Sequence, residues 1–237
     1  MKNNFKYLLK NIIRATIGLM ICSIGIYLGL VADVGLVPWD SLTMGLANLT
    51  SISYGKINIS ISLTILVTDI ILKERVGVGT ILDALLTGTF IDILYIALPI
   101  TKPGSIIVGL IYLTVGMFVI AFGTSVYMKA GLSCGPRDSL LVAIGKKFPK
   151  LKIGYVDMII KVLLIIISII IKGPVGIGTV YGMLMMGVCF NIVFGLIKFE
   201  PRSITHDDLL DTARKLQSWK LNIMDMLALL LQVIIIR

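Results

Sequence analysis

The chain has too few charged residues for a protein surrounded by water. Asp, Glu, Lys and Arg make up 15% of its 237 residues, whereas soluble domains carry roughly 25%. Several apolar runs approach the ~20 residues that span the hydrocarbon of a bilayer, and the alternation typical of an outer-membrane barrel is missing. The sequence therefore predicts an all-α, polytopic membrane protein whose main surroundings are a lipid bilayer.

Histidine and cysteine are also scarce. His206 is the single histidine, and Cys22, Cys134 and Cys189 lack the spacing of metal ligands or of a disulfide framework. We see no nucleophile–base pair and no Walker-type loop. The sequence therefore predicts no enzyme activity, no cofactor and no metal site.

The basic residues outnumber the acidic ones, with a net charge of +9. They occur in short clusters between apolar runs, as the positive-inside rule expects, so the pattern argues against a nucleic-acid partner. The first apolar run, Ala15 to Val31, is longer than the core of a signal peptide and lacks a cleavage site, which indicates an uncleaved span.

Two related motifs organise the chain: Gly35-Leu36-Val37-Pro38-Trp39-Asp40 and Gly131-Leu132-Ser133-Cys134-Gly135-Pro136-Arg137-Asp138. Each precedes an apolar segment that is too short to cross a bilayer. Asp40 and Asp138 are 98 residues apart. A constant offset of 99 relates further pairs: Gly55 and Gly154, Gly77 and Gly176, Gly79 and Gly178, Thr80 and Thr179, Gly88 and Gly187, and Asp92 and Asn191. Such a constant offset indicates an internal duplication.

The duplication divides the chain into two repeats of three spans and one short helix each. The first repeat, 1–104, is predicted to hold spans 12–31, 57–72 and 80–98 and the short helix 38–49. The second repeat, 105–202, is predicted to hold spans 106–128, 155–171 and 177–197 and the short helix 136–144. The tail, 203–237, is predicted to be a polar linker followed by a helix over 221–236 that either lies at the interface or forms a marginal seventh span.

The short helices predict how the repeats insert. Segment 38–49 would be about 18 Å long at 1.5 Å per residue, too short to cross, so we expect both short helices to be re-entrant. Three spans per repeat then place the two repeats upside down to each other. A cytoplasmic N-terminus puts most loop lysines and arginines inside, which favours this inverted arrangement.

Breaks in corresponding positions of two halves are the best pointer to a substrate or ion pathway. The candidates come from the two proline motifs and from the Val-Gly-x-Gly-Thr turns: Pro38, Trp39, Asp40, Pro136, Arg137, Asp138, Gly77, Gly79, Thr80, Gly176, Gly178 and Thr179. Their helix N-termini could converge and suit an anionic group, which Arg137 could also contact. The alternative is that they are ordinary helix starts and tight turns, with aspartate or threonine caps.

Intramembrane charges are further candidates. Asp92 lies past the middle of its span, where a carboxylate costs at least about 2.5 kcal/mol, so it could carry a proton or cation, or else bind a neighbouring helix. Asn191 is its uncharged counterpart, and Asp83 is expected at the interface. Asp157 and Lys161, four residues apart, predict an ion pair that is either structural or a gate.

The Gly35–Asp40 and Gly131–Asp138 motifs and the two Gly-x-Gly-Thr turns resemble the YczE/YyaS/YitT group of bacterial integral membrane proteins. The likeness covers about residues 12–198 and implies a bacterial plasma-membrane location, without substrate or catalytic residues. We expect a secondary transporter or permease for a small, unidentified solute, with an anion as one candidate. The alternative is a non-transporting scaffold or assembly factor, and a homo-oligomer is open for either.

Overall fold

The computed structural model describes residues 3–201, 204, 207–212 and 214; these residues form the helices α1–α8 and a further helical turn at 209–212 and 214, and they contain no strand. The helices are α1 (Asn3–Val31), α2 (Pro38–Thr50), α3 (Tyr54–Ile71), α4 (Val78–Ala97), α5 (Ile106–Met128), α6 (Pro136–Lys147), α7 (Ile153–Ile170) and α8 (Ile177–Leu196). All except α2 and α6 contain stretches long and apolar enough to cross a membrane. The prediction of an all-α protein with six membrane spans is confirmed, and the proposed helix over 221–236 lies outside the described residues.

The two short helices begin where the sequence places their prolines. Pro38 and Pro136 each occupy the first turn, where the missing N–H costs nothing because that group has no partner within the helix. Asp40 and Asp138 also lie in the first turns. Gly35 and Gly131 adopt positive φ angles, 97° and 65°, in the turns that precede these helices, a backbone conformation that glycine tolerates best.

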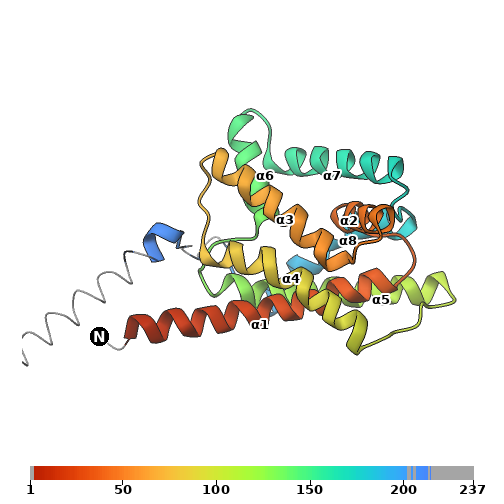
Figure 1. The fold of residues 1–237 in the computed structure, drawn as a ribbon, viewed down its shortest axis with the longest axis horizontal. Helices are drawn as coiled ribbons and strands as arrows, with labels where there is room; N and C mark the ends of the chain where they lie inside the picture. Colours follow the sequence, from red (N-terminus) through yellow and green to blue (C-terminus); the bar gives the residue numbers. More distant parts are fainter. Residues whose placement is uncertain (1–2, 202–203, 205–206, 213, 215–237) are drawn as a thin grey trace, which may run out of the picture.

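The helices α1 and α5 form the closest helix pair in the molecule and lie side by side along the bundle (Figure 1). Small residues permit this approach: a Cβ atom at Gly25 would lie 2.5 Å from the carbonyl oxygen of Gly116. Helices in membranes associate largely through such close packing, since lipid tails are as apolar as the side chains. The α1–α5 pair therefore forms the centre around which the other helices pack.

The remaining helices pack reciprocally around this pair. α4 packs on α1 and α8 on α5, while α2 contacts α7 and α6 contacts α3. Figure 1 shows α2 and α6 toward opposite ends of the bundle of long helices. One relation has no counterpart: α3 and α4 form an extensive interface, whereas α7 and α8 do not form a comparable one.

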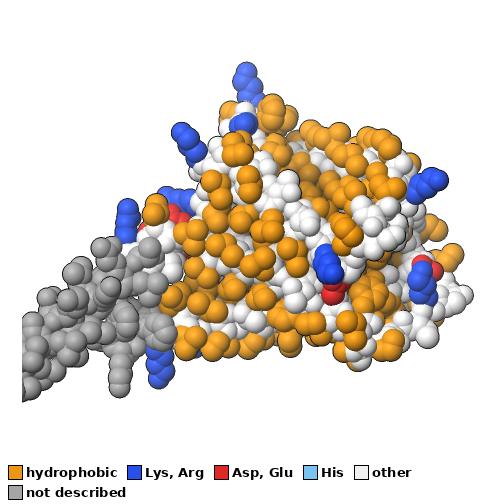
Figure 2. Space-filling model, in the orientation of Figure 1, with side chains coloured by type: hydrophobic (Ala, Val, Ile, Leu, Met, Phe, Trp, Pro, Cys, Tyr) orange, Lys and Arg blue, Asp and Glu red, His pale blue; other side chains and the backbone are white. Residues whose placement is uncertain are grey.

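The surface is mainly apolar around the bundle. Figure 2 shows hydrophobic side chains over much of the viewed face, with most lysines and arginines toward its edges and one basic side chain beside an acidic one near its middle. α7 and α8 contribute many exposed aliphatic residues, among them Ile159, Leu163, Ile166, Leu184 and Ile192. An exposed apolar surface of this extent fits lipid rather than water.

Candidate functional site

A cavity of about 310 Å³, here called the central cavity, lies inside the bundle and receives side chains from all eight helices. Its wall carries an unusual number of charged groups for a membrane protein: Asp83, Arg137, Asp138, Asp157 and Lys161. A smaller adjoining cavity of about 180 Å³ shares Arg137 and Lys161 with it and adds Asp40. Charged residues within spans are costly and normally face a watery cavity or a partner.

The two proline motifs meet at these cavities. Nη1 of Arg137 lies 3.5 Å from Oδ1 of Asp40, and its guanidinium lies 5.2 Å from the centre of the Trp39 ring. Nη2 donates a hydrogen bond of 2.5 Å to Asn58 Oδ1, and the Tyr54 hydroxyl donates one of 2.9 Å to Asp40. Asp40 therefore occupies a place beside Arg137 where an anionic ligand was expected.

Asp157 and Lys161 also face the central cavity. Lys161 Nζ donates to Asp157 Oδ2 at 2.6 Å, across one turn of α7. Both side chains are about one third exposed, which is consistent with their position at the cavity wall. Each of the two basic groups of the cavity thus already has a carboxylate beside it.

Two carboxylates of the cavity have no basic partner. Asp83 accepts a hydrogen bond of 2.6 Å from Thr87, and Asp138 has no hydrogen bond or ion pair with any described residue. Asp138 is exposed to the cavity that it lines. Burial and then the neighbouring Asp83 carboxylate raise the pKa of Asp138 to about 6, since both disfavour its charged form.

The Gly-x-Gly-Thr turns do not line the central cavity. Instead, each contacts the loop before the short helix of the other half. Gly79 N donates to Leu132 O at 2.7 Å, and Thr80 Oγ1 donates to Cys134 O at 2.8 Å. In the reverse direction, Gly178 N donates to Val34 O at 2.7 Å.

Threonine side chains complete both turns. Thr80 Oγ1 accepts from Gly77 N at 3.2 Å, and Thr179 Oγ1 accepts from Gly176 N at 3.0 Å. Both threonines are fully buried. The four helix starts therefore form two separate cross-paired sets and do not converge on one point, and the turn residues have backbone partners within the protein.

Asp92 lies away from the central cavity and caps another helix. Its carboxylate accepts hydrogen bonds from Gly55 N at 2.8 Å and from Ser53 Oγ at 2.6 Å. It thereby satisfies the free N–H group of Gly55 in the first turn of α3. The equivalent Asn191 is exposed on α8. The structure therefore places Asp92 where the helix-binding alternative puts it.

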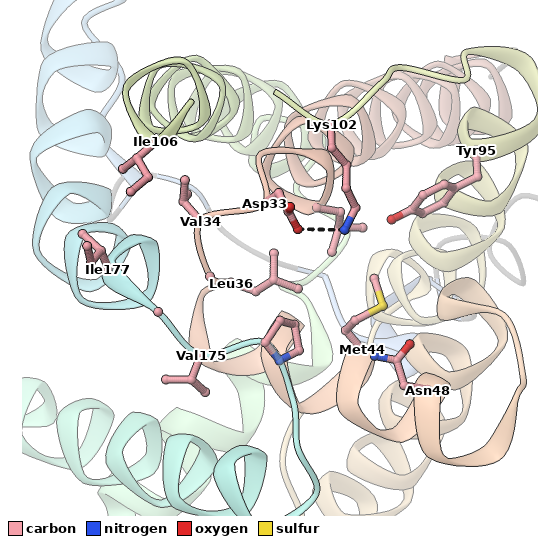
Figure 3. Close-up of a pocket in the computed structure, with 14 residues that line it drawn as sticks. Asp33, Val34, Leu36, Met44, Asn48, Tyr95, Lys102, Ile106, Val175 and Ile177 are labelled. Carbon is pink, nitrogen blue, oxygen red and sulfur yellow. Dashed lines mark hydrogen bonds and ion pairs between the residues drawn. The ribbon is translucent and has the colours of Figure 1, made fainter. Parts of the chain in front are cut away.

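A larger cavity of about 570 Å³, the outer cavity, lies at another end of the bundle, around the turns that contain Gly35 and Gly176. Figure 3 shows Asp33 and Lys102 joined across it, with a distance of 2.7 Å. Leu36 lines both this cavity and a narrow void of only about 10 Å³ that reaches Asp40. Buried Leu36 is thus the residue common to the linings of the outer cavity and of this void.

Sequence reasoning missed three groups of the central cavity. Asp83 was expected at the interface, but it faces Asp138 across the cavity wall. Asn58 and Tyr127 were not considered. For Asn58 a signal existed, because it lies 99 residues before Asp157 and therefore at the equivalent repeat position. Tyr127 has no such polar counterpart.

The fold and the cavity together define a multi-pass helical membrane protein built around a charged interior. The chain belongs to the family of unknown function DUF6198, whose family model matches residues 9–194. This assignment covers all six spans and both short helices, and it excludes the tail.

Three relatives show the same extent of similarity. The chain is 29% identical to the "Uncharacterized protein YyaS" of Bacillus subtilis over 77% of this chain and 91% of that protein. It is 29% identical to an uncharacterized protein of Haemophilus influenzae over 77% and 83%. It is 30% identical to the "Uncharacterized membrane protein YczE" of Bacillus subtilis over 72% and 79%. The resemblance to YyaS and YczE is thus confirmed, and no solved structure matches the chain.

Proposed function

We propose that the protein is a secondary transporter or permease that moves a small solute across the bacterial plasma membrane. The observation that carries this proposal is the charged central cavity, where Arg137 of one motif contacts Trp39 and Asp40 of the other. A merely structural bundle has little reason to keep five charged side chains around an open space, because each is expensive at membrane depth. The proposal includes no enzyme activity, because the sequence shows no nucleophile–base pair and no Walker-type loop.

The proposed architecture is a pair of inverted repeats with re-entrant α2 and α6 and a cytoplasmic N-terminus. The reciprocal packing of α2 on α7 and of α6 on α3 supports it, as do the reciprocal hydrogen bonds from Gly79 to Leu132 and from Gly178 to Val34. Inverted repeats commonly hold the substrate near the middle of the membrane, at the interface between the halves.

The difference between the halves supplies a route for the solute. The α3–α4 interface is closed and α7 and α8 are apart, while only a void of about 10 Å³, lined by Leu36 and Asp40, lies between the outer cavity and Asp40. If the halves exchange these two arrangements, the central cavity opens to the other side of the membrane, which is alternating access. On this proposal the arrangement described here is open toward the cytoplasm.

A flux measurement tests the transport proposal. Proteoliposomes would be loaded with a panel of small amines, carboxylates and sugars, and exchange would be followed with isotope label. We expect wild type to move at least one class, and Asp138→Asn to slow that flux at least tenfold. Glu74→Gln is the matched control, because Glu74 pairs with Lys146 and neither residue lines the central cavity or the smaller cavity beside it. If neither protein moves any solute faster than empty liposomes, the transport proposal is wrong.

Cysteine labelling tests the inversion. Asn48 near the end of α2 and Lys146 near the end of α6 are both exposed and are 98 residues apart, as Asp40 and Asp138 are. In a background without Cys22, Cys134 and Cys189, an impermeant maleimide should label Asn48→Cys only from outside. It should label Lys146→Cys only from inside. Labelling of both from one side contradicts the inverted repeat.

A non-transporting scaffold is the second candidate, and the satisfied contacts favour it. Arg137 is held by Asp40, Asn58 and Trp39, and Asp92 caps α3, so these groups could serve stability alone. A scaffold built from more than one copy would show a homo-oligomer in native mass spectrometry of the detergent-solubilised protein. It would also show no solute exchange in the flux measurement.

A further inference from the structure

The charges around the central cavity do not balance. Arg137 has Asp40 beside it and Lys161 has Asp157, so each base of the cavity is paired with a carboxylate. Asp83 and Asp138 form no ion pair with a basic residue in the part of the chain that the structure describes. The cavity therefore has an excess of negative charge, which attracts a cation and repels an anion.

A separate group in the same wall points to a ligand. Tyr127 on α5 lines the central cavity, is only 6% exposed, and its hydroxyl has no hydrogen-bond partner within the described part of the chain. A buried hydroxyl without a partner is costly and calls for an explanation. Its buried oxygen lies near the carboxylates of Asp83 and Asp138, so a donor bound between the three groups would give it the partner it lacks.

The size and lining of the cavity favour an organic ion over a metal ion. A volume of about 310 Å³ lies within the range of pockets for small organic ligands. Ile26, Ile120, Met186 and Phe190 provide an apolar part of the wall. The described residues hold no group of three acidic, histidine or cysteine side chains that could bind a metal, and hard cations need several oxygen ligands at once.

We propose that the central cavity binds a small organic cation, with its ammonium group between Asp83, Asp138 and the Tyr127 hydroxyl. The ammonium N–H groups donate to the two carboxylates and to the phenol oxygen. The hydrocarbon part lies against Ile120 and Phe190. This inference takes from the proposed function only that the central cavity is the ligand site, and it replaces the expected anion with a cation.

Binding to purified protein in detergent tests the inference without transport. The probes are 2-phenylethylamine, butylamine and benzylamine, with 3-phenylpropionate as an anion of similar shape and sodium chloride as the inorganic cation. We expect at least one amine to bind, as measured by calorimetry and by a rise in Tm. We expect 3-phenylpropionate and sodium at equal concentration to have at least tenfold weaker effects.

Three variants assign the site. Asp138→Asn and Asp83→Asn should weaken amine binding at least tenfold, and Tyr127→Phe about threefold, whereas the control Glu74→Gln should bind as wild type does. Tyr127→Phe removes a hydroxyl that has no partner among the described residues, so it tests the site even if an aspartate variant does not fold. Unchanged amine affinity in Tyr127→Phe and in both folded aspartate variants overturns the assignment.

The other outcomes also decide. Preferred binding of 3-phenylpropionate, equal protection by sodium, or no binding of any of the three amines overturns the organic-cation inference. Flux of a carboxylate in proteoliposomes would overturn it and leave transport standing. Amine binding that depends on Asp138, without flux of any solute, would support the cation site and count against transport.

Discussion

The helix pairs α3–α4 and α7–α8 hold equivalent places in the two repeats, yet they differ in packing. In the first pair, a Cβ atom at Gly55 would collide with the carbonyl oxygen of Gly88, and Asp92 caps the start of α3. In the second pair, Gly154 and Gly187 have nothing within 4 Å of their would-be Cβ positions, and Asn191 is exposed. Glycines at equivalent positions thus lie in close contact between α3 and α4 but face open space on α7 and α8.

The difference extends to the two motif aspartates. Asp40 of the first repeat is 7% exposed and is held by Arg137 and Tyr54. Asp138 of the second is open to the central cavity and has no hydrogen bond or ion pair with a residue that the structure describes. Duplicated sequence therefore does not mean duplicated environment. The motif aspartate of the first repeat holds the fold, whereas the motif aspartate of the second faces the cavity.

Two single variants, Asp40→Asn and Asp138→Asn, should show the largest contrast in unfolding free energy. Asp40→Asn leaves the guanidinium of Arg137 without a counter-charge in a mostly enclosed place, and we expect a loss of about 3 kcal/mol in unfolding free energy. Asp138→Asn removes no contact and should not destabilise the protein. The check is unfolding in mixed detergent micelles. Equal losses in the two variants would remove the contrast between the motifs.

Alanine at the equivalent helix glycines tests the packing contrast. Gly88→Ala places a methyl group against Gly55 and Ile59, so we expect a loss of about 1–3 kcal/mol from overpacking. Gly187→Ala meets open space and should be neutral or gain up to about 1 kcal/mol from helix propensity. Thermal unfolding measures both. A loss of more than about 1 kcal/mol in Gly187→Ala would indicate that α7 and α8 also close tightly.

The caps of the two pairs should differ less strongly. Asp92→Ala leaves Gly55 N and Ser53 Oγ without their acceptor, for which we expect a loss of about 1–2 kcal/mol. Asn191→Ala should change stability by less than about 0.5 kcal/mol, because Asn191 is exposed. The unfolding midpoints of the two variants, measured side by side, provide the comparison. The contrast fails if Asn191→Ala costs as much as Asp92→Ala.

The smallest expected effect is a dependence on pH. The charged groups that face Asp138 are Asp83 on α4, Arg137 on α6, and Asp157 and Lys161 on α7. The pKa of Asp138, about 6, lies above its value of roughly 3.9 in an unfolded chain. The protonated form therefore favours the folded state, and this contribution is lost as the pH rises from about 4 through 6. The Tm of Asp138→Asn relative to wild type should increase between pH 5 and pH 7.5.

The spans could be predicted from sequence because hydropathy over about 20 residues is a strong signal. The starts of α2 and α6 could be predicted as well, since Pro38 and Pro136 mark first turns. Helix ends beyond the apolar runs could not: α1 begins at Asn3, nine residues before the predicted span, because a helix can continue into water and hydropathy does not register that extension.

The partners of the polar residues were beyond sequence reasoning. Asp92 and Asp83 occupy the same helix and differ only by position, yet one caps α3 and the other faces the central cavity. The outcome depends on which neighbouring helix each carboxylate meets, and this is a property of the packed bundle. The cross-pairing of Gly79 with Leu132 is likewise a contact between repeats, which the internal spacing of either repeat does not encode.

These cross-repeat hydrogen bonds have a consequence for biosynthesis. The carbonyl of Val34 and the amide of Gly79 leave the ribosome long before the groups that satisfy them, Gly178 and Leu132. An unpaired backbone group within lipid costs several kcal/mol, so the nascent first half remains incomplete until the second half has been inserted. A chain terminated after α4 would thus keep the Val34 carbonyl and the Gly79 amide without these partners.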